Sequence, residues 1–89
     1  MPQEPHYRRD PSLPSQEIEG QVVVVVPSRR ELHELDEVAT FLWKELARPR
    51  RAEELTRALC EEYEVEPETA ERDVQAFLAL LKEKGLVAE

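Results

Sequence analysis

The fold of this chain is decided by residues 21–27, whose sequence is QVVVVVP. Valine is β-branched and favours extended backbone, and this run lies between Gly20 and Pro27, residue types that commonly end strands. The stretch therefore predicts a β-strand. Because the valines are consecutive and do not alternate with polar residues, we expect the strand to be covered on both faces or to lie centrally in its sheet.

Two shorter strands are predicted beside this run. Residues 16–18 precede a Glu19-Gly20 turn, and the loop at residues 27–30 returns the chain into a third strand at Glu31–Leu35. Turns this short join neighbouring antiparallel strands, so the three segments predict a three-stranded antiparallel meander.

Three helices are predicted after the strands. The first begins at the N-cap Asp36 and ends before Pro49, the second spans about residues 52–63, and the third spans residues 67–84 and is ended by Gly85. The predicted core positions of the third helix are Ala70, Val74, Phe77, Leu78 and Leu81, and Leu86 and Val87 are expected to fold back over their end.

The first 15 residues differ in composition from the rest, because Pro2, Pro5, Pro11 and Pro14 lie there among charged neighbours. Proline opposes both helix and central strand, so we predict a disordered or loosely extended arm over residues 1–15. A single domain follows over residues 16–89, since a chain of this length supports only one small core. The predicted class is α+β, a small sheet followed by a three-helix bundle in winged helix-turn-helix-like order.

The charge balance excludes several classes of partner. The chain has 20 acidic and 12 basic residues and a net charge of −8. A field of this sign repels phosphate backbones and anionic lipids, which argues against binding nucleic acid or a membrane surface. The longest apolar run is too short to span a bilayer and the N-terminus resembles no signal peptide, so the expected location is the cytoplasm.

The residues that could carry catalysis are few. His33 is better explained as a strand side chain than as a catalyst, and Cys60 as a small half-buried side chain than as a reactive thiolate. Metal-binding spacings such as CxxC or HExxH are absent, and two glycines cannot form a glycine-rich phosphate loop. The sequence therefore predicts no enzyme activity, no metal and no cofactor.

A winged-helix DNA-binding regulator is an alternative function. Its recognition helix would be the third helix, which carries Glu68, Glu71, Asp73 and Glu83 against Arg72, Lys82 and Lys84. That helix would be repelled by DNA. A basic cluster lies at Arg48, Arg50 and Arg51, and it is either a soluble turn or a contact for an anion or an acidic peptide.

An ordered set of motifs resembles the PqqD-like family, the precursor-peptide recognition elements of ribosomally made, modified peptide pathways. The motifs are Leu35-Asp36, Leu42-Trp43, Ala52-Glu53-Glu54-Leu55, Glu62-Tyr63-Glu64-Val65-Glu66-Pro67 and Gly85-Leu86. The resemblance runs from about Gln21 to the end of the chain. Asp36 replaces the usual asparagine, and the turn at residues 47–50 lacks the glycine often found there, which leaves the subfamily open.

The resemblance implies a non-catalytic protein that holds the leader segment of a precursor peptide and presents it to a modifying enzyme, often a radical-SAM protein. It also implies that the leader adds as a strand beside the third strand. The implied edge residues are Glu31, Leu32, His33, Glu34 and Leu35. This agrees with the meander, in which no later strand remains to pair with the third one.

The resemblance further implies that the leader lies in a groove formed with the third helix. Asp73, Ala76 and Leu80 are spaced three and four apart beside the core positions of that helix, so they are the expected groove wall. Leu80 is either additional core or a contact for an apolar leader residue. Trp43 has the same two interpretations, with core packing favoured.

Self-association is a second alternative function. An unpaired strand edge can pair with the same edge of another copy, so the chain could be a structural module or a homodimer. A homodimer is compatible with leader binding.

Overall fold

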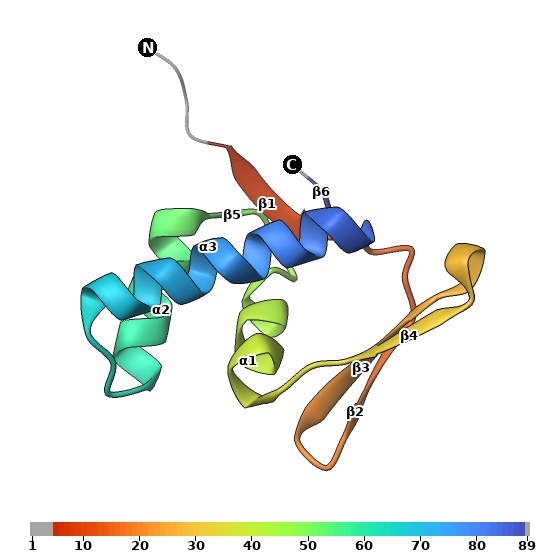
Figure 1. Cartoon of the computed structure of the whole chain (residues 1–89), viewed down its shortest axis with the longest axis horizontal. Coiled ribbons are helices and arrows are strands. Elements are labelled where there is room, and N and C mark those ends of the chain that lie inside the picture. The colour runs from red at the N-terminus through yellow and green to blue at the C-terminus, as the bar shows by residue number, and fades with distance from the viewer. Residues whose placement is uncertain (1–4, 89) are drawn as a thin grey trace.

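The computed structural model describes residues 5–88, which form three helices and two small sheets (Figure 1). The helices are α1 (Glu37–Glu45), α2 (Ala52–Glu62) and α3 (Pro67–Lys84). The strands are β1 (His6–Arg9), β2 (Ser15–Ile18), β3 (Gln21–Val26), β4 (Glu31–Glu34), β5 (Arg50–Arg51) and β6 (Val87–Ala88). The sheets have the strand orders β2-β3-β4 and β5-β1-β6. No helix within the described residues is long and apolar enough to cross a membrane.

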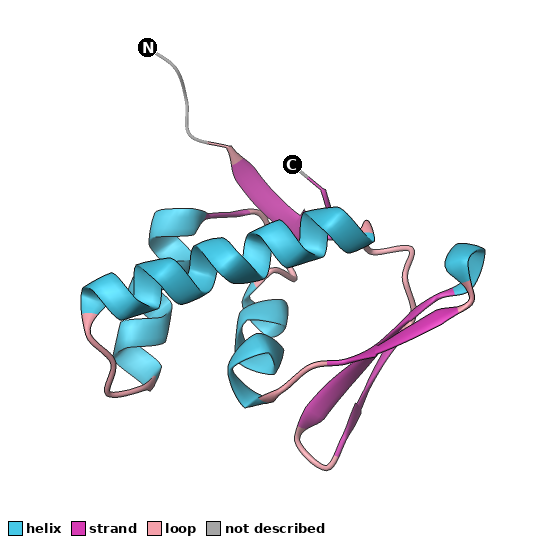
Figure 2. Cartoon of the chain, viewed as in Figure 1, coloured by secondary structure: helices cyan, strands magenta, loops and turns pink. Residues whose placement is uncertain are grey.

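The predicted meander is confirmed as the sheet β2-β3-β4, which lies to one side of the helices (Figure 2). β3 is its central strand and pairs antiparallel with both neighbours. The turn between β2 and β3 contains Glu19 and Gly20, whose φ values of 51° and 82° suit a two-residue hairpin turn. The valines alternate along β3: Val22, Val24 and Val26 are buried, and Val23 and Val25 are half-buried on the opposite face.

The hydroxyl of Thr40 links this sheet to α1. It accepts a hydrogen bond from the Val22 amide at 3.0 Å and donates one to the Leu35 carbonyl at 3.2 Å. The Leu35 amide itself donates to the Val22 carbonyl at 2.8 Å, so the hydroxyl replaces the second bond of this residue pair. Beside it, the Asp36 carboxylate accepts from the Ala39 amide at 2.8 Å, which confirms the predicted N-cap.

Replacing Thr40 with valine is expected to destabilise the protein by about 1–3 kcal/mol, because valine keeps the shape but leaves the Val22 amide and the Leu35 carbonyl without this partner. Urea unfolding followed by circular dichroism measures the change. Thr40→Ser keeps the hydroxyl and is the matched control. A Thr40→Val protein as stable as the wild type would show that the bridge contributes nothing.

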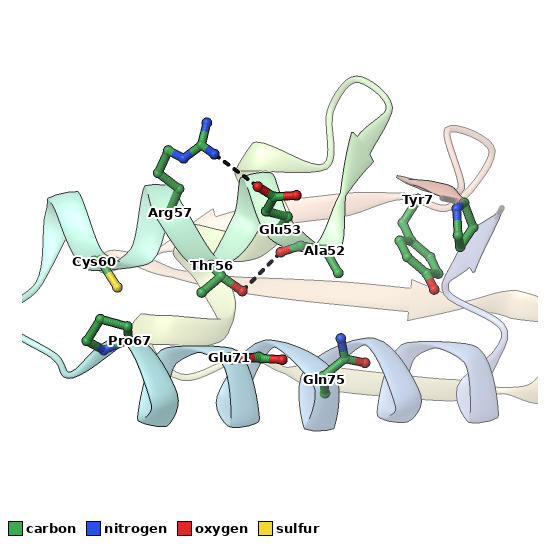
Figure 3. Close-up of a pocket in the computed structure, with 10 residues that line it drawn as sticks. Tyr7, Ala52, Glu53, Thr56, Arg57, Cys60, Pro67, Glu71 and Gln75 are labelled. Carbon is green, nitrogen blue, oxygen red and sulfur yellow. Dashed lines mark hydrogen bonds and ion pairs between the residues drawn. The ribbon is translucent and has the colours of Figure 1, made fainter. Parts of the chain in front are cut away.

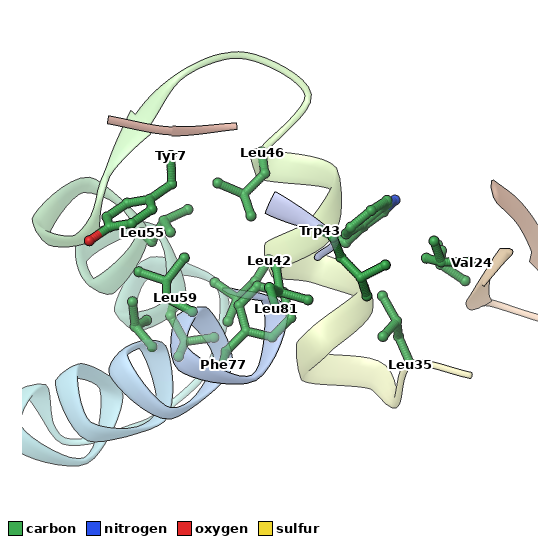
Figure 4. Close-up of a cluster of buried hydrophobic side chains, with 14 of the residues drawn as sticks. Tyr7, Val24, Leu35, Leu42, Trp43, Leu46, Leu55, Leu59, Phe77 and Leu81 are labelled. Carbon is green, nitrogen blue, oxygen red and sulfur yellow. The ribbon is translucent and has the colours of Figure 1, made fainter. Parts of the chain in front are cut away.

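The core draws side chains from α1, α2 and α3, and α3 packs along α2 (Figure 4). The five core positions predicted for α3 are all buried: Ala70, Val74, Phe77, Leu78 and Leu81. Trp43 of α1 is only 1% exposed and belongs to the same cluster, so its core interpretation is confirmed. The guanidinium of Arg9 lies 5.6 Å from the centroid of the Trp43 ring.

The end of α3 follows the prediction closely. Gly85 takes a φ of 72°, a conformation that glycine adopts without strain. Its amide donates to the Lys82 carbonyl at 3.2 Å, and the Leu86 amide donates to the Leu81 carbonyl at 2.8 Å. These two bonds form a Schellman motif, which folds Leu86 back until it is 1% exposed.

The N-terminal segment differs from the prediction. His6–Arg9 are not loosely extended but form β1, the central strand of the second sheet. Tyr7 is 9% exposed and joins the core cluster. Pro5 and Pro11 lie outside β1, one before it and one after it. Proline has no amide to donate, but at these positions it removes no hydrogen bond from the strand. The part of the predicted arm at residues 1–4 lies outside the described residues.

Two predicted loops also contain regular structure. Arg50 and Arg51 form β5, which pairs with β1 through the residue pairs His6↔Arg51 and Tyr7↔Arg50. The loop after β3 contains a short 3-10 helix at Pro27–Arg29. Both segments are too short to show a periodic sequence pattern, which is why they were predicted as turns.

Candidate functional site

The strand β4 is an edge of its sheet. In the described part of the chain it pairs with β3 and with no other strand. In an antiparallel ladder, hydrogen-bonded residue pairs alternate with non-hydrogen-bonded pairs. The Leu35 amide donates to the Val22 carbonyl, so two residues earlier the His33 amide also points toward β3, where its partner residue is Val24. The amides and carbonyls of Leu32 and Glu34 therefore point away from the sheet, where an added strand could bond to them.

The side chains of the predicted edge residues divide between the two faces of the sheet. Leu35 is 6% exposed and belongs to the core. His33 is half-buried on the same face, with its Nε2 atom 3.7 Å from the Glu31 carboxylate, beyond hydrogen-bonding distance. Leu32 and Glu34 are exposed on the opposite face. The predicted edge therefore presents mainly backbone amides and carbonyls to a partner strand, because its side chains point to the two faces of the sheet.

A cavity of about 390 Å³ lies between α1 and α3, next to the end of β4. Its lining residues are Asp36, Val38, Ala39, Leu42, Asp73, Ala76, Phe77 and Leu80. The three predicted groove residues are all among them. Leu80 is 43% exposed, so its side chain is open to a ligand and is not part of the buried core. Apart from the two aspartates, the lining is apolar.

The α1 wall of this cavity was not predicted from the sequence. Val38 and Ala39 lie in the first turn of α1 and are half-buried, whereas Leu42 and Trp43 face the core. Apolar residues in a first turn, outside the main core stripe, are the signal that could have indicated a second contact surface.

A larger cavity of about 660 Å³ lies between β1, α2 and α3 (Figure 3). Its lining residues are Pro5, Tyr7, Ala52, Glu53, Thr56, Arg57, Cys60, Pro67, Glu71 and Gln75. Arg57 pairs with Glu53 at 3.1 Å, and the Thr56 hydroxyl donates to the Ala52 carbonyl at 3.0 Å. These polar groups are satisfied within α2. None of the predicted groove or edge residues lines this cavity.

The lining of the two cavities shows no catalytic arrangement. Cys60 is the one thiol in the larger cavity, and no histidine lies among the lining residues to act as its base. Within residues 5–88, no cluster of three or more histidine, cysteine, aspartate or glutamate side chains could hold a metal ion. The smaller cavity, whose lining is apolar apart from two aspartates, suits the binding of an apolar group.

The basic cluster is not brought to the edge or to either cavity. Arg50 lies 3.5 Å from the Glu45 carboxylate, and Arg48 is exposed. The Arg51 amide donates to the Glu54 carboxylate at 2.8 Å, and this bond lowers the pKa of Glu54 below its ordinary value. A role for these arginines in contacting a charged partner stays a prediction.

Comparison with known families decides the relationship. Residues 21–87 match the family described as coenzyme PQQ synthesis protein D, PqqD. This chain belongs to the PqqD family. The match begins where the motif resemblance begins, and it spans the β3–β6 part of the fold. A comparison with curated proteins gives no significant match.

Solved structures share the fold of this PqqD-family chain over nearly its full length. TbiB1, solved in complex with the TbiA(beta) leader peptide, is 32% identical, with a TM-score of 0.82 over 90% of this chain and 93% of that one. A lasso peptide synthetase B1, solved with its leader peptide, is 26% identical, with a TM-score of 0.81 over 93% and 98%.

A third structure supports the fold alone. It is the PqqD truncation of Methylobacterium extorquens PqqCD, described as a stand-alone RiPP recognition element, and it is 20% identical with a TM-score of 0.76 over 94% of this chain and 89% of that one. The predicted class, a three-stranded antiparallel sheet with three helices, is confirmed by these matches and by the fold itself.

Proposed function

We propose that this protein is a non-catalytic accessory protein that binds the leader segment of a ribosomally made precursor peptide and presents it to a modifying enzyme, such as a radical-SAM protein. The observation that carries the proposal is the free edge of β4 beside an apolar cavity, in a fold shared with two proteins solved with leader peptides. Because the precursor is made on ribosomes, we place this function in the cytoplasm.

The leader would add to β4 as a fourth strand of the sheet. Its backbone would bond to the outward groups of Leu32 and Glu34, and main-chain bonds of this kind give affinity that depends little on sequence. Alternate leader side chains would then point toward α3, where the cavity lined by Ala76 and Leu80 lies. An apolar leader residue is expected there, because burying it stabilises the complex by about 25 cal/mol per Å².

The charges around the cavity restrict what the leader can place beside it. Asp36 and Asp73 both line the cavity, and they come from different helices. An acidic leader residue at that end would be repelled, whereas a neutral or basic one would be accepted. The function consists of tethering: a bound leader raises the effective concentration of the rest of the precursor at the enzyme.

The test is fluorescence polarisation of a labelled leader peptide, taken from a small open reading frame beside this gene, with the purified protein. We expect saturable binding, and we expect Leu80→Glu to weaken it at least about tenfold by placing a charge in the apolar cavity. The folded state should tolerate this change, since Leu80 is 43% exposed.

The matched control is Ala79→Glu, which adds the same charge at an exposed neighbouring position of α3 outside the cavity lining. It should bind the leader like the wild type. Equal affinities for the two variants would remove the cavity from the proposal, and the absence of binding to any neighbouring peptide would overturn the function itself.

Self-association is a second candidate, favoured by the same free edge. Two β4 strands of separate copies could pair by the same backbone groups that a leader would use. Size-exclusion chromatography with light scattering at two concentrations measures this. A dimer that dissociates when leader is added would show that both partners compete for β4.

A further inference from the structure

The sheet β2-β3-β4 has one face that the rest of the described chain does not cover. Its inner face packs on the helices through alternate valines of β3. The opposite face carries Val23 and Val25, with Leu32 of β4 opposite Val25 and Ile18 of β2 diagonal to Val23. Leu32 is 60% exposed and Ile18 is 52% exposed. We name these four residues the outer face.

The outer face explains why the valine run is uninterrupted. A strand with one solvated face alternates apolar and polar residues, whereas β3 has valine on both sides. Three large apolar side chains are exposed in the described residues. Leu32 and Ile18 lie on the outer face, and Leu80 lines the cavity between α1 and α3. A second apolar surface is therefore present in addition to the leader groove.

We propose that the outer face is the docking surface for the modifying enzyme that receives the bound leader. This inference rests on the proposed function and adds to it the surface on which the enzyme binds. The first argument is continuity. A leader strand paired to β4 extends the sheet by one strand, and every second leader side chain would then extend the outer face beside Leu32.

The second argument is size, which favours the enzyme over a second copy of this chain. The paired part of the sheet, four residues along each of three strands, spans roughly 200 Å², from strand spacings near 4.8 Å and a rise near 3.3 Å per residue. A standard interface buries about 800 Å² on each partner. The outer face is too small to hold a stable dimer alone, but it suits an enzyme that also contacts the leader.

The third argument is charge. Glu34 lies on the outer side of the sheet next to the apolar residues, and Glu19 is exposed at the β2–β3 turn. With a chain of net charge −8, the complementary surface is an apolar patch bordered by lysine or arginine. The enzyme's contact surface is therefore expected to be apolar at its centre and basic at its rim.

The experiment measures binding of the purified modifying enzyme from the same gene cluster to immobilised protein, with and without saturating leader peptide. We expect leader to strengthen enzyme binding, because it enlarges the surface. Ile18→Lys should weaken enzyme binding at least about tenfold and change leader affinity less than about twofold, since Ile18 lies on the strand farthest from β4. Leu32→Lys is the second variant.

Ala79→Lys is the matched control, because it places the same side chain at an exposed position away from the outer face. Circular dichroism verifies that each variant is folded. Enzyme affinity unchanged in both Ile18→Lys and Leu32→Lys would overturn the inference. So would a wild-type dimer that Ile18→Lys converts to a monomer while enzyme binding is retained. If the wild-type protein did not bind leader at all, the proposed function would be overturned instead. The measurement of enzyme binding without leader would still test whether the outer face is a docking surface.

Discussion

Replacing Glu34 with proline is expected to lower leader affinity by about tenfold to a hundredfold while leaving the fold intact. The Glu34 amide points away from β3, so proline removes no bond from the existing ladder. The leader carbonyl that would accept from this amide is left unsatisfied, which costs about 1–3 kcal/mol. Fluorescence polarisation with the labelled leader measures the loss.

The controls separate backbone from side chain. Glu34→Ala keeps the amide and should bind the leader within about twofold of the wild type, because the side chain is exposed on the outer side. His33→Pro removes an amide that bonds to β3 and is expected to destabilise the sheet itself. A Glu34→Pro protein that binds leader normally would show that the peptide does not add to β4.

Tyr7→Ala is expected to cause the largest loss of stability, about 3–5 kcal/mol, because it deletes an aromatic ring packed in the core. The ring is 9% exposed, and the Lys82 ammonium lies 5.0 Å from its centroid. In a domain of this size that change lowers Tm by at least roughly 12 °C. Thermal unfolding followed by circular dichroism gives the value.

Tyr7→Phe keeps the ring and should lose less than about 1 kcal/mol. His6→Ala, at an exposed position of the same strand, should be similarly mild. If Tyr7→Ala unfolded at the wild-type temperature, β1 would not be part of the folded core, and the loosely extended arm predicted from the prolines would be the better description of residues 6–9.

The parts of the fold that were predictable are those with strong local signals. The valine run marked β3, and the third helix lies between Pro67 and Gly85 as expected. β1 was missed because its sequence, HYRR, has one apolar residue, and its two partners are two-residue strands far along the chain. The role of Thr40 was missed for a similar reason. Its hydroxyl bonds to Val22 and Leu35, which lie opposite each other only in the folded sheet.

The candidate site was predictable in outline. The strand order shows that β4 is an edge, as the meander implied, and Asp73, Ala76 and Leu80 share one cavity. The sequence could not show which amides of β4 face outward, because this depends on the ladder register with β3. The α1 wall was equally inaccessible, because the packing of α1 against α3 is set by tertiary contacts.

The pairing of β1 with β5 and β6 joins the N-terminal part of the described chain to its middle and to its C-terminal part. Arg9 lies opposite Val87, so the strand synthesised first in the described chain is completed by the strand synthesised last. Tyr7 lies opposite Arg50 of β5, and the Lys82 ammonium near the end of α3 lies over its ring, so its packing is complete only after the end of α3 has been made. Contacts this distant in sequence slow folding, whereas the free edge of β4 depends only on pairing between neighbouring strands, so we expect that edge to form before β1 is packed into the core.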